Sequence, residues 1–454
     1  MAVWNVINRT DIFPDRFDAE YHSKPFIDNV AYLKGLGSVT TLGTLFKSIQ
    51  RGGQPKYSPK GTVKVLRSAN VGFMTFNDTR QEYVTQESFN KSIRGQVKTN
   101  DVLITSTGVG TLGRTSIWYD KTNAFCDGHI TILRNTNVNP YFITVYLNSK
   151  YGLLQFAQNY RGSSGQIEIY PYDLSKFVIP TFLFKYQEEI GNYLIESFKQ
   201  QEKSHTLYHQ AEALLTKELQ LDKLQLPKNK WYTAQYSEVV DDGRMDSEYF
   251  SPVVKKILEA DFLKGGFTIG GLFYIVRGYT PKSYYTMGVP MVKTKSVRTP
   301  VIDKKRIEDY ANSNESLTLT QENDLILAAM GVGSLGRTSF ITQDDSGVAI
   351  DGTLRIFRKK DENLKYVEIP TMLFLSTEIG QKLIYRGIVG STGIISVTDD
   401  YLAKIPVPMV DEPIRKKLTE LVLKSIDAKK QSQALLARAK TRVEELIEQE
   451  ANKK

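Results

Sequence analysis

A unit of about 226 residues occurs twice in this chain, and this repetition constrains the fold more than any other feature. The motif RFDAEY at 16–21 returns as RMDSEY at 244–249, and NDVLI at 100–104 returns as NDLIL at 323–327. Further segments match along nearly the whole length, at separations that stay between 223 and 228 residues. Self-similarity at a fixed period is the mark of a repeated structural unit. The 454 residues therefore encode two copies of one domain.

Both repeats follow the same internal order. A region of short β-type runs with Gly, Pro and Asn between them comes first, and a long stretch suited to a helix follows it. Inside the β-rich regions, the segments 141–159 and 366–384 are predicted to be helical. The predicted divisions are a first domain at 1–184, a first long helix at 185–227, a second domain at 228–410 and a second long helix at 411–454.

Apolar residues recur at spacings of three and four along both long helical stretches. They include Ile190, Leu194, Leu207, Leu214 and Leu215 in the first stretch, and Ile414, Leu418, Leu421, Leu435 and Leu446 in the second. One apolar stripe on a charged helix is typical of helices that pack along their length. Because the stretches come from a duplicated unit, each is the simplest partner for the other; the alternative is that each helix packs on its own domain. A helix of 40 residues would be about 60 Å long.

A glycine-rich loop in each repeat resembles a dinucleotide-binding motif. TGVGTLGRTSIW at 107–118 and MGVGSLGRTSF at 330–340 both contain G-x-G-x-x-G after an apolar run. That motif requires a helix after its third glycine, whereas the residues here are Thr-rich, aromatic and β-favouring. We therefore expect the loop to join two strands, with Arg114 or Arg337 near its tip. Both arginines are candidate DNA contacts, although residues shared by the two repeats are better suited to shaping the loop or touching the backbone than to reading bases. The glycines expected to shape it by adopting positive φ are Gly108, Gly110, Gly113, Gly331, Gly333 and Gly336.

Each repeat contains one sharply basic segment, and such segments attract polyanions by releasing condensed counterions. Residues 51–80 carry six cations and one acid, and residues 277–306 carry eight cations and one acid. The candidate DNA contacts in them are Arg51, Lys56, Lys64, Arg67, Arg277, Lys282, Lys293, Lys295 and Arg298. The alternative is that each cluster is an ordinary solvent-exposed surface. The occurrence of two such clusters at matching positions of the repeats argues against this alternative.

Each repeat contains a hydroxyl-rich turn, RGSSGQIEI at 161–169 and VGSTGIISV at 389–397. The side chains and backbone N–H groups of these turns are suited to contact phosphates or base edges. Their candidate contacts are Arg161, Ser163, Ser164, Gln166, Ser391 and Thr392. A purely structural turn leading into a strand is the alternative.

No arrangement of residues indicates catalysis or a metal site. Cys126 is the only cysteine, which excludes an intrachain disulfide and a cysteine-based metal cluster. NPYF at 139–142 departs from the methyltransferase motif that it resembles and is expected to begin a helix; His205 and His209 lack a third ligand and are expected to be exposed. No apolar run is long enough to span a membrane, and the first residues lack an export pattern, so we expect a cytoplasmic protein.

The chain resembles the specificity (S) subunit of prokaryotic Type I restriction–modification systems. The resemblance rests on the tandem β-rich repeats that end in VIP and IPVP, on the long helix after each, and on the repeated R-x-D-x-E-Y and GxGxLGRTS motifs. The resemblance implies an α+β fold in which two pseudo-two-fold related target recognition domains are separated by an antiparallel two-helix coiled coil. Each domain would read one half of a split sequence in double-stranded DNA, and the coiled coil would set the gap and dock two methyltransferase subunits.

The resemblance also implies that this chain binds no cofactor and catalyses nothing. S-adenosylmethionine would bind the methyltransferase subunits, and ATP and Mg would bind the restriction subunit. The assembled complex would methylate adenine at N6 and cleave unmodified DNA. Two alternatives stay open: a specificity subunit of a Type II-like system with fused methyltransferase and nuclease, and a two-headed scaffold that binds proteins.

Overall fold

The computed structural model describes residues 6, 12, 16–78, 80–162, 165–228, 231–390 and 394–453. Two compact units make up the chain: unit 1 comprises residues 1–201 and 430–454, and unit 2 comprises residues 202–429. Each unit contains the body of one repeat together with one part of each long helix. No helix in the described segments is both long and apolar enough to cross a bilayer.

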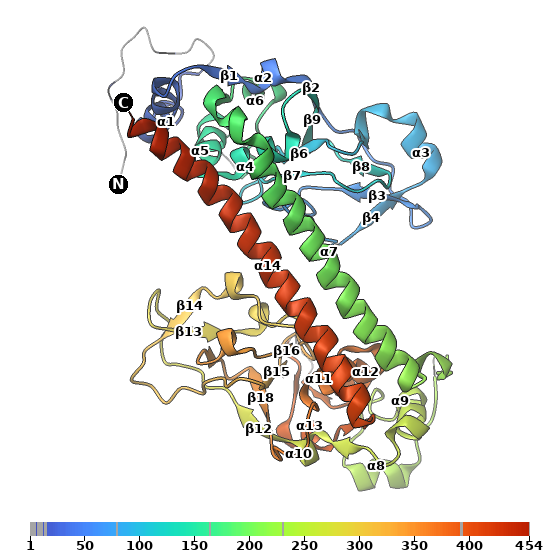
Figure 1. Cartoon of the computed structure of the whole chain (residues 1–454). Helices are drawn as coiled ribbons and strands as arrows, with labels where there is room; N and C mark the ends of the chain where they lie inside the picture. Colours follow the sequence, from blue (N-terminus) through green and yellow to red (C-terminus); the bar gives the residue numbers. More distant parts are fainter. Residues whose placement is uncertain are drawn as a thin grey trace. The chain divides into compact units, whose positions relative to one another are not determined.

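Unit 1 is built around a four-stranded antiparallel sheet in the order β2-β9-β6-β7, beside a second sheet in the order β4-β3-β8-β5 and a small pair β1-β10 (Figure 1). The strands of the first sheet are β2 (Phe46–Arg51), β9 (Ile130–Thr136), β6 (Val102–Thr105) and β7 (Thr115–Ile117). Those of the second are β4 (Glu82–Val84), β3 (Val63–Leu66), β8 (Ala124–Cys126) and β5 (Gln96–Val97). The pair consists of β1 (Val39–Thr41) and β10 (Val178–Pro180), and the short helices are α1 (Lys24–Gly35), α2 (Leu42–Leu45), α3 (Gln86–Lys91), α4 (Pro140–Asn148), α5 (Lys150–Asn159) and α6 (Pro171–Ser175).

Unit 2 repeats the main sheet strand for strand, whereas its second sheet has three strands in place of four. Its main sheet has the order β12-β18-β15-β16, and its second sheet has the order β14-β13-β17. These strands are β12 (Phe273–Arg277), β18 (Leu354–Lys359), β15 (Leu325–Ala328), β16 (Thr338–Phe340), β14 (Asp309–Ala311), β13 (Val289–Val292) and β17 (Ala349–Ile350). The small pairs are β11 (Phe267–Thr268) with β21 (Pro406–Val407) and β19 (Ile388–Val389) with β20 (Ser396–Val397). Its short helices are α8 (Tyr236–Asp242), α9 (Pro252–Leu258), α10 (Ile269–Leu272), α11 (Glu368–Ser376), α12 (Glu378–Arg386) and α13 (Asp399–Lys404).

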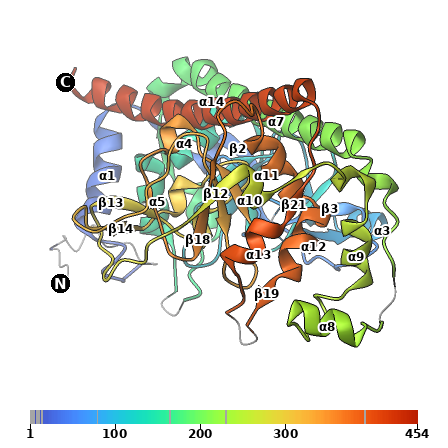
Figure 2. The ribbon, with the colours of Figure 1, turned by 90° about the horizontal axis from the view of Figure 1, so that it is seen from below.

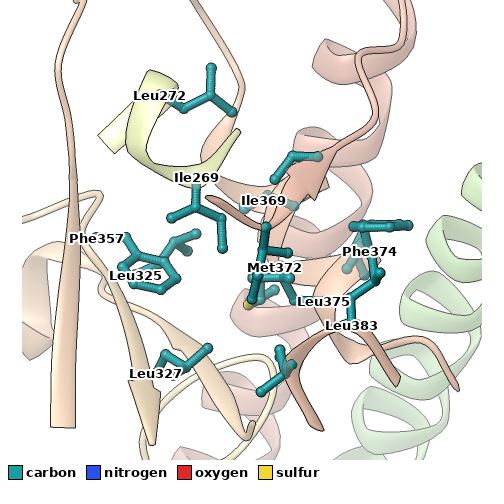
Figure 3. Close-up of a cluster of buried hydrophobic side chains, with 14 of the residues drawn as sticks. Ile269, Leu272, Leu325, Leu327, Phe357, Ile369, Met372, Phe374, Leu375 and Leu383 are labelled. Atoms are coloured by element: carbon teal, nitrogen blue, oxygen red, sulfur yellow. The ribbon is translucent and has the colours of Figure 1, made fainter. Parts of the chain in front are cut away.

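The main sheet of each unit is buried on both faces, because alternate residues of a strand point to opposite sides. In unit 2, Leu325 and Leu327 of β15 face a cluster that includes Met372 of α11 (Figure 3), whereas Ile326 and Ala328 face a second cluster. In unit 1, Val102 and Ile104 face the helical side and Leu103 the other. This double burial explains why VLIT and LILA read as unbroken apolar runs.

The segments predicted as single helices, 141–159 and 366–384, each form two helices. The break falls at Ser149 in unit 1 and at Thr377 in unit 2, where each side chain accepts a hydrogen bond from the backbone N–H three residues on and caps the second helix. As predicted, NPYF begins a helix: Asn139 caps α4, and Pro140 is its first residue.

An ion pair between a partly exposed arginine and a buried aspartate holds the main sheet in both units. Arg134 of β9 donates two hydrogen bonds to Asp101, just before β6, at 2.8 and 2.5 Å. Arg358 of β18 donates two to Asp324 at 3.0 and 2.7 Å. The aspartates are 2% and 1% exposed, so their charges depend on these arginines. The aspartates belong to the repeated motif NDVLI and NDLIL, and the arginines end a second repeated motif, DGHITILR at 127–134 and DGTLRIFR at 351–358. Both motifs are therefore structural.

The R-x-D-x-E-Y motif forms a clamp near the start of each repeat. Arg16 donates to both oxygens of Asp18, its guanidinium lies 4.3 Å from the centroid of the Tyr21 ring, and it also bonds the carbonyls at the end of α5. Arg244 makes the equivalent bonds to Asp246 and to the Ile388 carbonyl. The hydrogen bonds from Arg16 lower the pKa of Asp18 to about 2. The motif thus ties the start of each repeat to the end of the helix pair.

Within unit 1, the first part of α7 (Gln187–Glu218) packs antiparallel to the last part of α14 (Glu412–Ala451) (Figures 1 and 2). Ile190 and Leu194 are buried against Val443 and Leu446. Glu189 pairs with Arg442, whereas Ser197 donates to the carbonyl of Ser432 at 3.0 Å. Because the partner number falls as the α7 number rises, the helices run in opposite directions.

Within unit 2, the rest of α7 and the first part of α14 pack in the same way. Leu215 and Leu418 are buried in one cluster, and the Ser204 and Ser425 hydroxyls lie 3.1 Å apart. Four residues that were predicted in the stripe are half-buried here: Leu207, Leu214, Ile414 and Leu421. Leu435, in unit 1, is half-buried as well. The apolar pattern did not predict that small polar residues also lie in the interface between the two helices. The first helix is also shorter than the predicted stretch 185–227, because Gln220 adopts a left-handed conformation just after it.

Replacing Arg134 with methionine leaves the Asp101 carboxylate buried without its cation. We expect Arg134→Met to lower the free energy of unfolding by about 3–5 kcal/mol. The control Lys91→Met breaks an exposed pair with Glu87, which we expect to contribute less than about 1 kcal/mol. Urea unfolding followed by circular dichroism measures both changes, and equal losses would contradict a structural role for the Arg134–Asp101 pair.

Candidate nucleic-acid interface

The glycine loop connects two antiparallel strands in each unit, as predicted. It joins β6 to β7 in unit 1 and β15 to β16 in unit 2. In unit 1, Gly108, Gly110 and Gly113 have φ values of +100°, +76° and +85°. Gly331, Gly333 and Gly336 have +104°, +74° and +82°. L-residues with a side chain rarely adopt this region, so the glycines determine the loop conformation.

The loop does not have the geometry of a dinucleotide site. In unit 1 the N–H of Gly108 donates to the Ile167 carbonyl, that of Leu112 to the Gly108 carbonyl and that of Gly113 to the Thr105 carbonyl, at 2.9 to 3.0 Å. A strand follows the loop, whereas pyrophosphate binding uses free N–H groups at the start of a helix. The backbone donors are therefore used inside the protein.

The arginine of each loop folds back on the loop itself. Arg114 donates to the Gly110 carbonyl at 2.6 Å, and Arg337 bonds the Gly333 carbonyl in the same way. Both bonds span four residues and close the bend. This arrangement favours loop shaping as the main role of the two arginines.

Each glycine loop lies against the hairpin of the hydroxyl-rich turn in its own unit. The Gly108 N–H donates to Ile167, and the Ile169 N–H to Ser106, both at 2.9 Å. In unit 2, Gly331 donates to Ile395 at 2.9 Å and Val397 to Ala329 at 3.0 Å. The structure thus joins two motifs that the sequence presented separately. Ser163, Ser164, Ser391 and Thr392 lie outside the described residues, and Arg161 bonds the buried Asp173 at 2.8 Å.

A hollow of about 770 Å³ opens beside the glycine loop of unit 1. Four segments line it: part of 51–57, the loop residues 107–108, the turn 127–129 and the hairpin residues 166–168. Arg51 fixes its wall by donating to the Gly128 and Ile169 carbonyls at 3.1 and 2.9 Å and to Glu168 at 3.2 Å. The guanidinium of Arg51, a predicted DNA contact, is therefore used within the protein.

The polar character of this hollow comes from side chains that unit 2 lacks. His129 Nδ1 lies 2.8 Å from the Thr107 hydroxyl. Asp127, whose pKa is raised by burial, is common to both units, because unit 2 has Asp351 at the same position. At the positions equivalent to Thr107, His129, Gln166 and Glu168, unit 2 has Met330, Thr353, Ile394 and Ser396. The backbone is the same, since the bridge between Thr107 and Glu168 recurs between Met330 and Ser396. One scaffold therefore presents two different surfaces.

The predicted basic contacts fall into two groups. Several have acidic neighbours: Lys64 pairs with Asp78 at 3.1 Å, Lys293 with Asp309 at 3.2 Å and Lys295 with Glu308 at 2.5 Å, and Arg67 lies 3.9 Å from Glu82. Lys56, Lys282 and Arg277 are exposed, and no ion pair is found for them among the described residues. Lys56 and Lys282 occupy equivalent positions. They are the cations best placed to meet phosphates in both units.

Sequence reasoning missed an aromatic residue in each unit. Tyr284 donates to Asp351 at 2.6 Å, and the Lys293 ammonium lies 3.3 Å from the centroid of its ring. In unit 1, Tyr57 lines the hollow; burial raises its pKa, and the Asp127 carboxylate raises it further. The two tyrosines are offset by one position in the repeat alignment, which hides their correspondence.

Unit 2 also places Arg298 beside the strand that follows Arg337 of the glycine loop, whereas Arg306 is paired with Asp303 at 2.8 Å. The Arg298 N–H donates to the Ser339 hydroxyl at 3.0 Å, and this hydroxyl donates back to the Arg298 carbonyl, so Arg298 lies along β16 near Arg337. Burial lowers the pKa of Arg298, and the charges of Arg337 and Arg306 lower it further. Such a concentration of like charge is suited to an anion. Unit 1 has Gly72 at the position of Arg298.

Nothing in the described part of the chain has the arrangement of a metal site. No group of three or more His, Cys, Asp or Glu side chains is placed to hold an ion there. His205 and His209 are exposed, as predicted, and His209 bonds Glu212 at 2.8 Å. Cys126 is buried, which raises the pKa of its thiol.

The chain is similar to several solved structures. No protein-family profile and no curated protein sequence matches the chain. The chain is similar to the S subunit of a Type I restriction–modification system from M. genitalium, at 15% identity over 91% of this chain and 95% of that one, with a TM-score of 0.46. It is also similar to the HsdS subunit from Thermoanaerobacter tengcongensis, at 14% identity over 88% and 96%, with a TM-score of 0.28. A third chain comes from a study of assembly and conformational transition in the type I R-M system, at 12% identity over 88% and 97%, with a TM-score of 0.29. These structures come from the same family that the repeated motifs resemble.

Replacing Gly110 with alanine tests the role of the loop glycines. The added Cβ meets no atom within 4 Å, so strain at φ +76° is the main cost. We expect Gly110→Ala to lower the free energy of unfolding by about 1–2 kcal/mol. Gly35→Ala, also in open space but without positive φ, is expected to be neutral or stabilising. Urea titrations of both variants would reveal whether backbone conformation matters, and an unchanged Gly110→Ala protein would contradict it.

Proposed function

We propose that this chain is the DNA sequence-recognition subunit of a Type I restriction–modification complex. Each unit reads one half of a split target in double-stranded DNA, and the chain itself performs no catalysis. The observation that carries the proposal is the pair of equivalent surfaces: the same main-sheet strands, loops and ion pairs recur, while the exposed residues around the glycine loop change. A duplicated framework with different exposed residues suits two unlike half-sites, because base edges specify sequence whereas phosphate contacts only position the protein.

The exposed cations support a phosphate-binding role. Lys56 and Lys282 are at the same position in the two repeats, beside segments that differ between them. Contacts of this kind contribute affinity without sequence information, because every step of the duplex carries the same charge. Exposed residues that differ between the units then supply the discrimination.

The helices account for spacing and assembly in this proposal. α14 has 40 residues and is therefore about 60 Å long, which is compatible with half-sites one helical turn of DNA or more apart, at about 34–36 Å per turn. The helix pair docks two methyltransferase subunits, which bind S-adenosylmethionine and methylate adenine. A restriction subunit supplies ATP- and Mg-dependent cleavage. In the competing Type II-like arrangement, one fused partner supplies both methylation and cleavage.

Sequencing of methylated bases in cells that carry the chain with its methyltransferase partner tests the proposal. A split motif with modified adenine in both halves is the expected result, and a chain without its partner should produce none. A contiguous motif, or binding to proteins with no preference among duplex sequences, would overturn the proposal and favour the scaffold alternative.

Removing both exposed lysines tests the phosphate contacts. We expect Lys56→Ala with Lys282→Ala to weaken binding equally for all duplex sequences and to reduce the slope of log K against log salt by about 2. The control Lys91→Ala with Lys264→Ala removes exposed lysines that pair with neighbouring acids on their own elements. Fluorescence anisotropy at several salt concentrations gives the slope. A loss confined to one base position would assign these lysines to base reading instead.

A further inference from the structure

The hairpins against the two glycine loops hold one residue of each unit in the same backbone setting. Gln166 in unit 1 and Ile394 in unit 2 both precede the residue whose carbonyl accepts the hydrogen bond from the first loop glycine. Each also has its own carbonyl packed over a glycine with positive φ, Gly162 at +103° and Gly390 at +100°. Backbone pairing therefore fixes where the two side chains begin.

The two side chains are both exposed, but their chemistry is opposite. Gln166 lines the polar hollow of unit 1, and no described hydrogen bond uses its side-chain amide. Ile394 is 69% exposed and lies next to the residue bonded to Gly331. The 68% exposed Val332 of the glycine loop has an equally exposed counterpart in unit 1, Val109 at 66%, so Ile394 and not the valine distinguishes unit 2. Thr107, which faces Glu168 across the hairpin in unit 1, is replaced by Met330 in unit 2. Unit 1 thus offers an amide, and unit 2 offers an apolar surface.

The major-groove edges of the DNA bases present one group that suits the amide of unit 1 and one that suits the apolar surface of unit 2. A glutamine side-chain amide accepts a hydrogen bond from the N6 amino group of adenine and donates one to N7, and no other base offers this donor and acceptor in that order on its major-groove edge. The C5 methyl of thymine is the one apolar group on the major-groove edge, and aliphatic side chains contact it. An exposed isoleucine alone needs no explanation, but here it stands at the position where the other repeat has a free amide.

We propose that Gln166 reads an adenine in the half-site of unit 1 and that Ile394 reads a thymine methyl in the half-site of unit 2. This inference rests on the proposed function and deepens it, because it names the residues that make the two half-sites different. The hollow of unit 1 receives the adenine edge beside the glycine loop, and the apolar loop surface of unit 2 receives the methyl group.

Base analogues in the duplex test the two contacts separately. The full chain, purified with its methyltransferase partner, is titrated with its split target carrying 7-deazaadenine at single adenines of the first half-site, or deoxyuridine at single thymines of the second. We expect one 7-deazaadenine position to weaken wild-type binding about tenfold. We expect one deoxyuridine position to weaken it about fourfold, the effect of one buried methyl group.

Substitutions then assign each loss to a residue. Gln166→Ala should bind the natural target more weakly and become insensitive to 7-deazaadenine, while staying sensitive to deoxyuridine. Ile394→Ala should show the reverse pattern. Gln166→Glu, which keeps the side-chain length but can only accept, should shift the preference at the same position toward cytosine, whose N4 donates.

The outcomes distinguish this inference from the function on which it rests. If Gln166→Ala stays sensitive to 7-deazaadenine at every position, or Ile394→Ala stays sensitive to deoxyuridine, the corresponding contact is wrong although the split target stands. If the wild-type complex recognises no split target, the proposed function itself is overturned.

Discussion

The arginine–aspartate pair of each main sheet is the interaction on which the rest of the structure depends. It joins the strand that leads into the glycine loop with the strand that returns from the DG turn, and the same arginine also bonds a carbonyl of the neighbouring segment, Gln96 in unit 1 and Leu319 in unit 2. A guanidinium fork and a carboxylate satisfy each other only in one relative orientation. The loop and the turn are therefore presented from a fixed base, and the exposed positions around them can change without loss of the fold.

Much of this fold could be predicted from the sequence because duplication doubles every pattern. The strand–loop–strand arrangement around the glycines followed from β-favouring residues after the loop, and the helix pair followed from apolar spacing. What the patterns missed were breaks and small residues. Ser149 and Thr377 interrupt segments whose apolar spacing continues, because their hydroxyls cap a second helix. At each break a glycine three residues on, Gly152 or Gly380, allows the second helix to begin close against the end of the first, where a Cβ would meet its backbone at 2.2 to 2.6 Å. Ser197 and Ser204 lie inside the helix interface, where their hydroxyls bond across it, although composition alone would place them outside.

The candidate site was less predictable, because the sequence indicates charge but not partners. Lys64, Lys293 and Lys295 belong to basic segments, yet acidic residues from neighbouring segments lie beside them. The guanidinium of Arg51 is used in hydrogen bonds within the lining of the hollow in unit 1. Tyr57 and Tyr284 escaped notice because they correspond in space while differing by one position in the repeat. The exposed pair Gln166 and Ile394 becomes informative only when the hairpin register shows that the two positions coincide.

The serine contacts between the long helices have a consequence for how such a chain can evolve. Sliding α7 past α14 by one helical turn, about 5.4 Å, would leave the hydroxyls of Ser197 and Ser204 facing aliphatic side chains, at about 1–3 kcal/mol for each unsatisfied group. Intermediate slips are penalised as well, since the same hydroxyls must find a partner. The serine contacts therefore fix the register of the two helices in each unit, so that an insertion or deletion in one helix would have to be matched by one in the other.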